Sequence, residues 1–261
     1  MSDAAASDTW MLAVETPVEV CVNGEPFAVM LATPSNLPEL ALGLLITEQV
    51  IIGTERVQHS NVAVGLNEAR VNLDVPSAAV RRDRLRSRAV PGNSGCGLCG
   101  IETLAQLQTR PTRAPAGKRA VSDLAIECAF RAFSAKQPLN AATRSVHAAA
   151  WCNMEGDILL VREDVGRHNA LDKLVGALAA SHRLAEQGFI IMSSRCSYEL
   201  VAKTSFTAAQ LLATISAPTT MALQWARALD LPLVGTSRRG DGLAIVRFGD
   251  PNTSLTAPSI P

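Results

Sequence analysis

The second half of the chain alternates short apolar segments with segments of helical periodicity, and this alternation limits the possible folds more than any other feature of the sequence. Ser122 is placed to cap a helix that runs to about Ala135. Strands are predicted over residues 145–152, 157–164, 188–193, 231–237 and 243–248, and further helices over 168–184, 197–213 and 218–229. Pro218 is expected to begin the last helix, and Glu199 is expected to pair with Lys203 one turn along the helix before it. Such alternation is typical of an α/β domain in which helices cover a largely parallel or mixed sheet.

The first stretch of the chain is predicted to be rich in β-structure. Two alternating runs meet at Asn23-Gly24, which is a strong signal for a hairpin. A helix with a proline in its first turn follows over residues 36–51, and a second hairpin is expected over residues 61–75. Composition then turns basic and glycine-rich before the α/β pattern begins. We therefore predict a β-rich N-terminal domain over residues 1–90, a mobile loop and linker over 91–118, and an α/β domain over 119–261.

Two of the six cysteines form the sharpest local motif. Cys96 and Cys99 make a C-x-x-C pair framed by glycines, and glycines let another surface approach a thiol closely. In such motifs the first cysteine is usually the exposed nucleophile, and the second resolves or protects it. The other four stand alone in apolar or helical surroundings, where a buried, inert thiol is expected: Cys21, Cys128, Cys152 and Cys196.

The C-x-x-C pair alone leaves three interpretations open. It can be half of a structural zinc site, although no second pair of ligands stands at a suitable spacing. It can be a redox pair, although it lies in mid-chain after a basic loop and not after the first strand of a β-α-β unit. It can also carry sulfur between partners. No metal site is predicted.

Charge and hydropathy narrow the setting in which the protein works. Formal net charge is zero, so no overall field draws the protein to nucleic acid or to a membrane surface. The sequence shows no apolar stretch of about 20 residues and no basic start followed by an apolar core. These features predict a cytoplasmic protein with reduced thiols.

Several longer motifs resemble the formate dehydrogenase accessory sulfurtransferase family. The most specific is REDVGRHNALDKLVG, over residues 162–176. Others are LALGLLITEQVI (40–51), SSRCSYELVAK (193–203), SAPTTMA (216–222) and LVGTSRRGD (233–241). The resemblance extends from about residue 15 to about residue 250.

The resemblance implies a function. Cys96 is expected to accept sulfur, as a persulfide, from a cysteine desulfurase. The sulfur is then passed to the molybdenum bis(molybdopterin guanine dinucleotide) cofactor, which formate dehydrogenase requires for activity. The resemblance also implies a homodimer and a mixed-sheet, three-layer, cytidine-deaminase-like fold for the C-terminal domain. The deaminase zinc signature, H-x-E followed by P-C-x-x-C, is absent from the sequence.

The resemblance also assigns a cofactor-binding segment: Thr236, Ser237, Arg238, Arg239, Gly240 and Asp241. The arginines are suited to clamping pyrophosphate, and Asp241 could accept hydrogen bonds from guanine N1 and N2. A guanine nucleotide is expected to fit the same pocket. An ordinary hairpin turn is the alternative for this segment. Further pocket candidates are Arg162, Asp164, His168, Arg195 and Lys203, whereas His147 is expected to be a core histidine.

The chain departs from the family at three places, where glycines or an aromatic residue are lost: Arg144-Ser145, Ser194 and Thr236. Two other functions stay open. The protein could deliver the cofactor as a chaperone without transferring sulfur, or it could be a dithiol redox protein.

Overall fold

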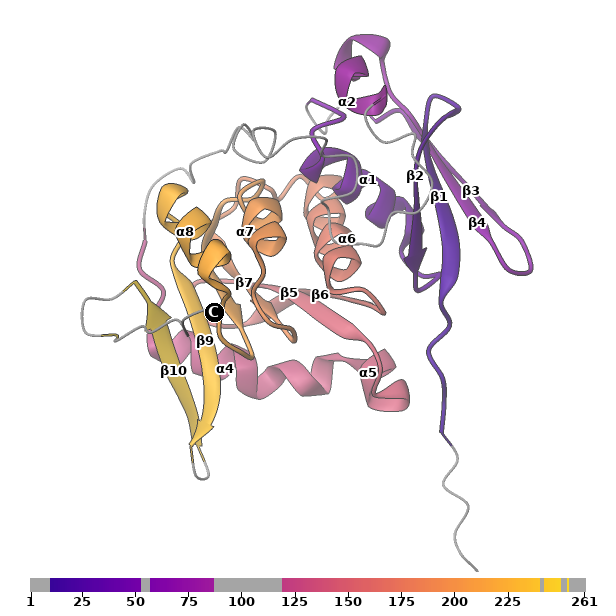
Figure 1. Ribbon diagram of the computed structural model, residues 1–261. Helices are drawn as coiled ribbons and strands as arrows, with labels where there is room; N and C mark the ends of the chain where they lie inside the picture. The colour runs from indigo at the N-terminus through magenta and orange to yellow at the C-terminus, as the bar shows by residue number, and fades with distance from the viewer. Residues whose placement is uncertain (1–9, 53–56, 87–118, 240–241, 250–252, 254–261) are drawn as a thin grey trace, which may run out of the picture.

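The computed structural model describes residues 10–52, 57–86, 119–239, 242–249 and 253, and it shows a mixed α/β fold with two mixed sheets (Figure 1). The N-terminal sheet has the order β2-β1-β4-β3. Its strands are β1 (Thr16–Val22), β2 (Glu25–Ala32), β3 (His59–Val64) and β4 (Ala69–Asp74). Strands β1 and β4 are parallel, and the two hairpins are antiparallel. Both hairpins lie where the alternating sequence predicts them.

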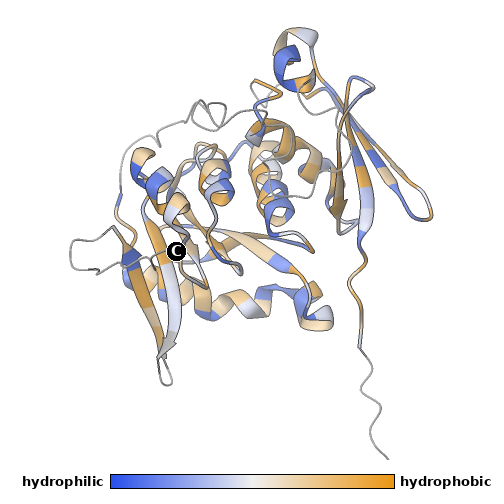
Figure 2. Cartoon of the chain, in the orientation of Figure 1, coloured by the Kyte–Doolittle hydropathy of each residue, from blue (hydrophilic) through white to orange (hydrophobic). Residues whose placement is uncertain are grey.

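One long helix covers the inner side of this sheet. Helix α1 (Leu37–Thr47) begins with a proline in its first turn, as predicted, and most of its residues are buried. Figure 2 shows α1 as an almost wholly apolar helix. A 3-10 turn, η2 (Ser77–Ala79), and the short helix α2 (Arg82–Arg86) follow the sheet.

The C-terminal sheet has the order β10-β9-β8-β7-β5-β6. Its strands are β5 (His147–Cys152), β6 (Ile158–Asp164), β7 (Gly188–Met192), β8 (Ala209–Thr214), β9 (Leu233–Arg239) and β10 (Gly242–Phe248). Strands β7, β8 and β9 are parallel, whereas β5 and β10 run antiparallel to their neighbours. The sheet is therefore mixed, as predicted.

Helices cover both faces of the C-terminal sheet and give three layers (Figure 1). On one face lie α4 (Asp123–Phe133), the turn η3 (Ser134–Lys136) and α5 (Pro138–Thr143). On the other lie α6 (Arg167–Ala180), α7 (Tyr198–Thr204) and α8 (Thr220–Ala228). Ser122 caps α4 as predicted, because its hydroxyl accepts a hydrogen bond from the Ala125 N–H. The cytidine-deaminase likeness of this domain stays a prediction.

Helix α1 packs against α6 and joins the two sheets. The crossing is so close that a methyl group on Gly43 would lie 1.8 Å from the Asp172 carbonyl oxygen. A methyl group on Gly176 would lie 1.9 Å from the Glu39 carbonyl oxygen. One apolar core includes residues of β1, α1, β5 and α6, so it runs through both parts of the molecule. The predicted domain division at residues 91–118 stays a prediction, since all of those residues lie outside the described part.

Two predictions about elements are wrong. Helix α7 ends at Thr204, and residues 209–214 form the central strand β8 instead of continuing the helix. Pro218 does not begin α8, because Thr219 is the N-cap and accepts a hydrogen bond from the Ala222 N–H. In the described part of the chain, no helix has the length and apolar character needed to cross a bilayer.

Candidate functional site

Polar and charged side chains gather at one edge of the C-terminal sheet. Strands β6 and β7 both run antiparallel to β5, and β8 and β9 run parallel to β7, so all four strands end at the same edge. Helices α6, α7 and α8 begin just beyond it. In α/β folds ligands bind at the carboxyl ends of strands, where helix N-termini and loops offer backbone donors. We take this carboxyl edge as the candidate functional site.

The start of β5 lies at the carboxyl edge between the ends of β6 and β7. His147 is paired in register with Asp164 at the end of β6. On the other side, the Ser193 hydroxyl accepts a hydrogen bond of 2.8 Å from the Ala148 N–H. The Ser193 N–H donates to the Ala148 carbonyl at 3.0 Å. These bonds hold the loop that follows β7 beside His147.

Positive charge surrounds His147. Burial lowers the pKa of His147, and the nearby cations Arg167, His168 and Arg195 lower it further, while Asp164 opposes them. The guanidinium groups of Arg167 and Arg195 have no hydrogen-bonding or ionic partner among the residues that the structure describes. A neutral imidazole beside two unpaired guanidinium groups is complementary to a phosphate or another anion. His147 was expected in the core, but its half-buried position at this edge brings it into the site.

A second polar group lies at the starts of α6 and α7. His168 Nε2 lies 3.7 Å from Glu199 Oε2 and 3.5 Å from Ser197 Oγ. Burial alone would raise the pKa of Glu199, but hydrogen bonds from His168 and Ser197 lower it overall. Glu199 therefore faces His168. The pair of Glu199 with Lys203 that the helical spacing predicts is not formed.

Three of the predicted pocket residues are engaged inside the protein. Arg162 forms a two-pronged ion pair with Glu39 of α1, with one N–O distance of 2.7 Å. Asp164 is fully buried and lies 2.6 Å from Lys173 Nζ. Lys203 donates to both carboxylate oxygens of Asp172, at 2.8 Å each. These side chains hold elements of the fold together, and a role for them in ligand binding stays a prediction.

Asp164 also shapes the site. Its carboxylate accepts hydrogen bonds from the Gly166 N–H at 2.8 Å, from the Asn169 amide at 3.0 Å and from the Thr33 N–H at 3.0 Å. It therefore fixes the turn that leads into α6 and ties that turn to the segment between β2 and α1.

The described part of the predicted cofactor-binding segment, residues 236–239, lies on β9 at the same edge. Thr236 is buried, and its hydroxyl donates to the Ile215 carbonyl at 3.3 Å. Ser237 is exposed and lines a cavity of about 440 Å³, together with Phe130 and Glu127 of α4. Gly240 and Asp241 lie outside the described residues, and so do the side chains of Arg238 and Arg239. The ligand-binding role of the segment stays a prediction.

The cysteines of the chain differ in their exposure to solvent, and the structure describes four of the six. Cys96 and Cys99 lie outside the described residues. Burial raises the pKa of Cys21, and it raises the pKa values of Cys152 and Cys196 to about 12. These three are buried thiols, as predicted. The same prediction is wrong for Cys128, which is exposed because it lies on α4 away from the face that carries Ala125 and Ala129.

Two departures from the family pattern differ in their structural effect. Arg144 stands where the family has a glycine, and its backbone has φ 54, the left-handed region that glycine favours. Its guanidinium lies over the Trp10 ring, 5.3 Å from the ring centre. Ser194 also replaces a glycine, but its φ is not positive, so the backbone there accepts a side chain. In the described ranges, no group of three or more His, Cys, Asp or Glu side chains is arranged to hold a metal ion.

Comparison with known proteins gives a consistent result. The FdhD/NarQ family model matches residues 13–245. A protein of Variovorax paradoxus named "Sulfur carrier protein FdhD" is 46% identical over 90% of this chain and 84% of its own length. A protein of the same name from Xanthomonas euvesicatoria is 41% identical over 88% of this chain and 82% of its own length. A crystal structure of a proposed formate dehydrogenase accessory protein from Desulfotalea psychrophila shares the fold, with a TM-score of 0.68 at 21% identity over 92% of this chain and 89% of that one.

Proposed function

The chain belongs to the FdhD/NarQ family, and from this membership we propose that it is a sulfurtransferase needed for formate dehydrogenase activity. The Cys96 thiolate attacks the outer sulfur of a cysteine desulfurase persulfide, the S–S bond of that persulfide breaks, the desulfurase cysteine leaves as a thiolate, and Cys96 becomes Cys96-S-SH. The outer sulfur then passes as sulfide to the molybdenum bis(molybdopterin guanine dinucleotide) cofactor, which is the substrate of the transfer: the new S–S bond breaks, Cys96 returns to the thiolate, and the reduced metal of the substrate would supply the two electrons. Curated relatives named as sulfur carriers, matched over most of this chain, are the observation that carries the proposal.

The state of the other cysteines supports a carrier in the C-x-x-C pair. Sulfur transfer needs a thiolate, because the thiol form is a poor nucleophile. Cys21, Cys152 and Cys196 are buried and have raised pKa values, so they are unsuited to this role. Among the described cysteines only Cys128 is exposed. Substitution of the exposed Cys128 is therefore the best control for a test of Cys96 as the sulfur carrier.

The carboxyl edge supports binding of an anionic cofactor. The cofactor carries pyrophosphate groups, and Arg167 and Arg195 are unpaired cations beside the start of α6. Arg238 and Arg239 on β9 add a second pair at the same edge, and Asp241 accepts from guanine N1 and N2. A guanine nucleotide alone occupies the same pocket in this proposal. Arg167 and His147 extend the binding surface beyond the segment that the sequence assigns.

The remaining parts of the proposal follow from the family. The protein acts in the cytoplasm, where the C-x-x-C pair stays reduced. It works as a homodimer, and its C-terminal domain is related in fold to cytidine deaminases. Its partners are a cysteine desulfurase and the formate dehydrogenase catalytic subunit.

Intact-protein mass spectrometry after incubation with a cysteine desulfurase and cysteine tests the transfer. We expect wild type and Cys128→Ala to gain the mass of one sulfur, which reductant removes, and Cys96→Ala to gain none. Cys96→Ala should also leave formate dehydrogenase inactive in cells while the purified variant still binds a guanine nucleotide. Full activity with Cys96→Ala would contradict sulfur transfer and favour a delivery chaperone. A ready Cys96–Cys99 disulfide, with both cysteines needed and no sulfur gained, would favour a redox protein.

A further inference from the structure

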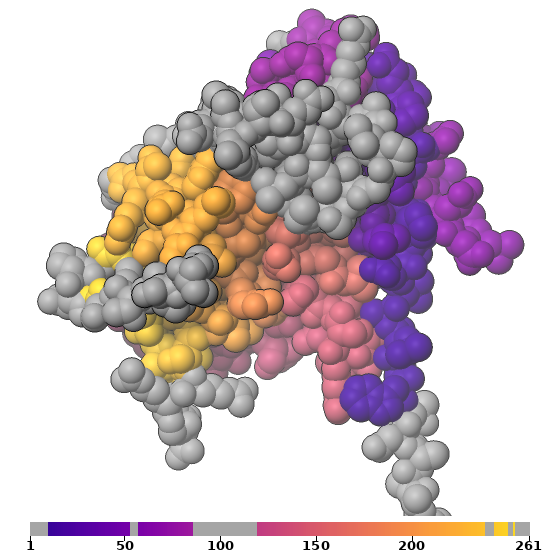
Figure 3. All heavy atoms as spheres, viewed as in Figure 1, coloured from indigo at the N-terminus to yellow at the C-terminus, as the bar shows by residue number. Residues whose placement is uncertain are grey.

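No strand in the described part of the chain pairs with the outer edge of the N-terminal sheet. Strand β3 is the last strand of the order β2-β1-β4-β3, and each of its six residues is exposed. The space-filling view shows the β3–β4 hairpin standing out from the body of the molecule at the right (Figure 3). Sheet edges of this kind pair readily with other chains, and proteins normally protect them with charges, prolines or bulges.

Strand β3 has none of these protections. Its sequence, HSNVAV, contains no lysine, arginine, acidic residue or proline, and its ladder with β4 has no register shift. The opposite edge strand, β2, carries Glu25 and Pro26, and its Leu31 carbonyl accepts a hydrogen bond of 2.8 Å from the Asn169 side chain. The β2 edge thus carries a charge, a proline and a hydrogen bond from α6, whereas the β3 edge has none of these among the described residues.

The backbone of β3 defines what can bind. The Gly65 N–H donates to the Glu68 carbonyl at 2.8 Å. Because only every second residue of an antiparallel strand bonds to its neighbour, Ala63 faces β4, and Val62 and Val64 turn their N–H and C=O groups to the open side. Directional donors and acceptors at this spacing are matched only by another extended chain.

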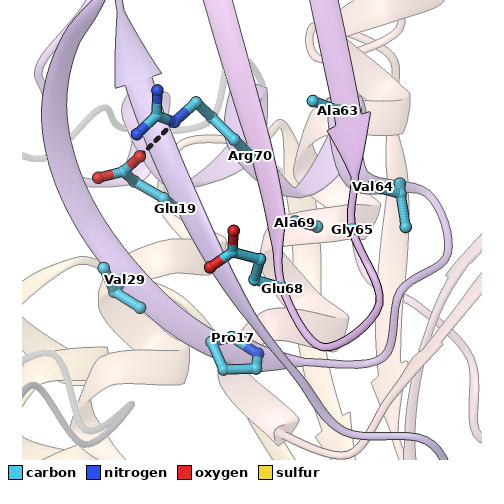
Figure 4. A pocket seen from close by; sticks show the side chains of 9 residues that line it. All are labelled: Pro17, Glu19, Val29, Ala63, Val64, Gly65, Glu68, Ala69 and Arg70. Carbon is cyan, nitrogen blue, oxygen red and sulfur yellow. Dashed lines mark hydrogen bonds and ion pairs between the residues drawn. The ribbon is translucent and has the colours of Figure 1, made fainter.

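The side chains beside this edge add a chemical preference. Val62 and Val64 are 38% and 65% exposed, and Leu66 at the tip of the hairpin is fully exposed. A cavity of about 590 Å³ lies beside them, lined by Pro17, Val29, Ala63 and Val64 among others (Figure 4). These surfaces favour apolar side chains at alternate positions of the bound segment.

One carboxylate in this cavity sets a charge preference. Glu19 is paired with Arg70, as the dashed line in Figure 4 shows. Glu68 is exposed and has no ionic or hydrogen-bonding partner for its carboxylate in the described residues. A lysine or arginine of the bound segment would complement it.

We propose that an extended segment of the client protein, with alternating apolar residues and one basic residue, binds to β3 as a fifth strand of the N-terminal sheet. The inference rests on the proposed function, in which the client is the formate dehydrogenase catalytic subunit. A second copy of this chain fits less well. An antiparallel self-pairing centred on Val62 sets Ser60 opposite Val64, and one centred on Ala63 sets Val62 opposite Val64 but leaves residues 59–61 unpaired.

Binding of the purified formate dehydrogenase catalytic subunit to immobilised full-length protein tests this inference. Val62→Pro removes an outward N–H without removing a bond to β4, so it should weaken binding roughly tenfold, the loss expected for one or two main-chain hydrogen bonds. Glu68→Lys should slow association at low salt, with the difference disappearing at high salt. Leu31→Lys, which adds a charge to an exposed position of the opposite edge strand β2 outside this cavity, is the matched control and should bind as wild type does.

Further readouts separate this inference from the proposed function. All three variants should melt within a few degrees of wild type and accept sulfur on Cys96 as wild type does. Equal binding by wild type and Val62→Pro would overturn the docking site, and so would a wild type that does not bind the catalytic subunit. Conversion of a dimer to a monomer by Val62→Pro would assign the edge to a second copy and overturn it as well. Failure of sulfur loading in wild type would instead overturn the proposed function.

Discussion

Asp164 and Lys173 form an ion pair with no exposure to water, and Asp164 organises the turn at the candidate site. Removal of one partner from such a pair leaves a buried charge without compensation. We expect Lys173→Met to lower the free energy of unfolding by about 3–5 kcal/mol in urea titrations followed by circular dichroism. Arg70→Met breaks the exposed pair with Glu19 and should lower it by less than about 1 kcal/mol. Similar losses from both variants would contradict this view of the buried pair.

His147 gives the site a pH dependence. Its pKa in the folded chain lies below the ordinary value of 6.5, because of burial and of Arg167, His168 and Arg195. Below pH 6.5 the unfolded chain therefore takes up a proton that the folded chain resists. The stability contributed by neutral His147 is present above pH 6.5 and is lost as the pH falls through the folded pKa.

Thermal melting of wild type and His147→Gln checks this sign. We expect the melting temperature of wild type to fall more steeply than that of the variant as the pH is lowered from 7.5 to about 5.5, below the ordinary histidine pKa of about 6.5. A steeper fall for His147→Gln would mean that the folded chain holds the proton more tightly than the unfolded chain.

Single residues mark the limit of what the sequence predicts about the site. The motif at residues 162–176 correctly points to a polar turn between a strand and a helix. It does not tell which of its charges face inward, and Arg162 and Asp164 are paired with Glu39 and Lys173. Glu39, the partner of Arg162, lies 123 residues away in the sequence, so the spacing of nearby residues cannot predict this pair. The prediction of a core histidine at His147 is wrong because it rests on apolar neighbours in the sequence, whereas the exposure of His147 depends on its place at the start of β5.

At the scale of elements, the crossing of α1 and α6 depends on two glycines. Gly43→Ala and Gly176→Ala would each place a methyl group less than 2 Å from a backbone oxygen of the other helix. We expect each substitution to cost about 3 kcal/mol of stability, although alanine is the better helix former, because the helices must move apart. Gly65→Ala in the β3–β4 turn is the control, since its nearest neighbours would be 3.3 and 3.4 Å away. An unchanged or raised urea midpoint for Gly43→Ala would contradict the close crossing.

Elements with a clear period were predicted well, and one without it was not. Hairpins at Asn23-Gly24 and at residues 64–69 follow from alternation and turn residues. The segment from Thr207 to Thr214, TAAQLLAT, is rich in alanine and leucine and has no clear period, so its sequence suits a buried strand as well as a helix. Its position between β7 and β9 decides the outcome, because all six residues of β8 are buried in the centre of the sheet.

At the scale of the whole molecule, the continuous core predicts cooperative unfolding. Leu40 and Leu44 of α1 belong to the same apolar cluster as Leu171 and Leu174 of α6 and Trp151 of β5. We expect urea unfolding curves from tryptophan fluorescence and from far-ultraviolet circular dichroism to coincide. Leu44→Ala, in the N-terminal part, should shift both curves to lower urea by the same amount and reduce stability by about 2–5 kcal/mol. Two separated transitions, with only one shifted, would show that the parts unfold independently.

The close crossing of α1 and α6 also limits how such proteins can be recombined. Each helix has a glycine at the crossing, and the backbone of the other helix occupies the space that a side chain would fill there. The fit between the two helices is therefore reciprocal. A chimera assembled from two relatives should keep activity when α1 and α6 come from the same parent. It should fail when the junction separates them, even if each half is intact. The N-terminal sheet is therefore inherited with the helix it rests on, and not as an exchangeable module.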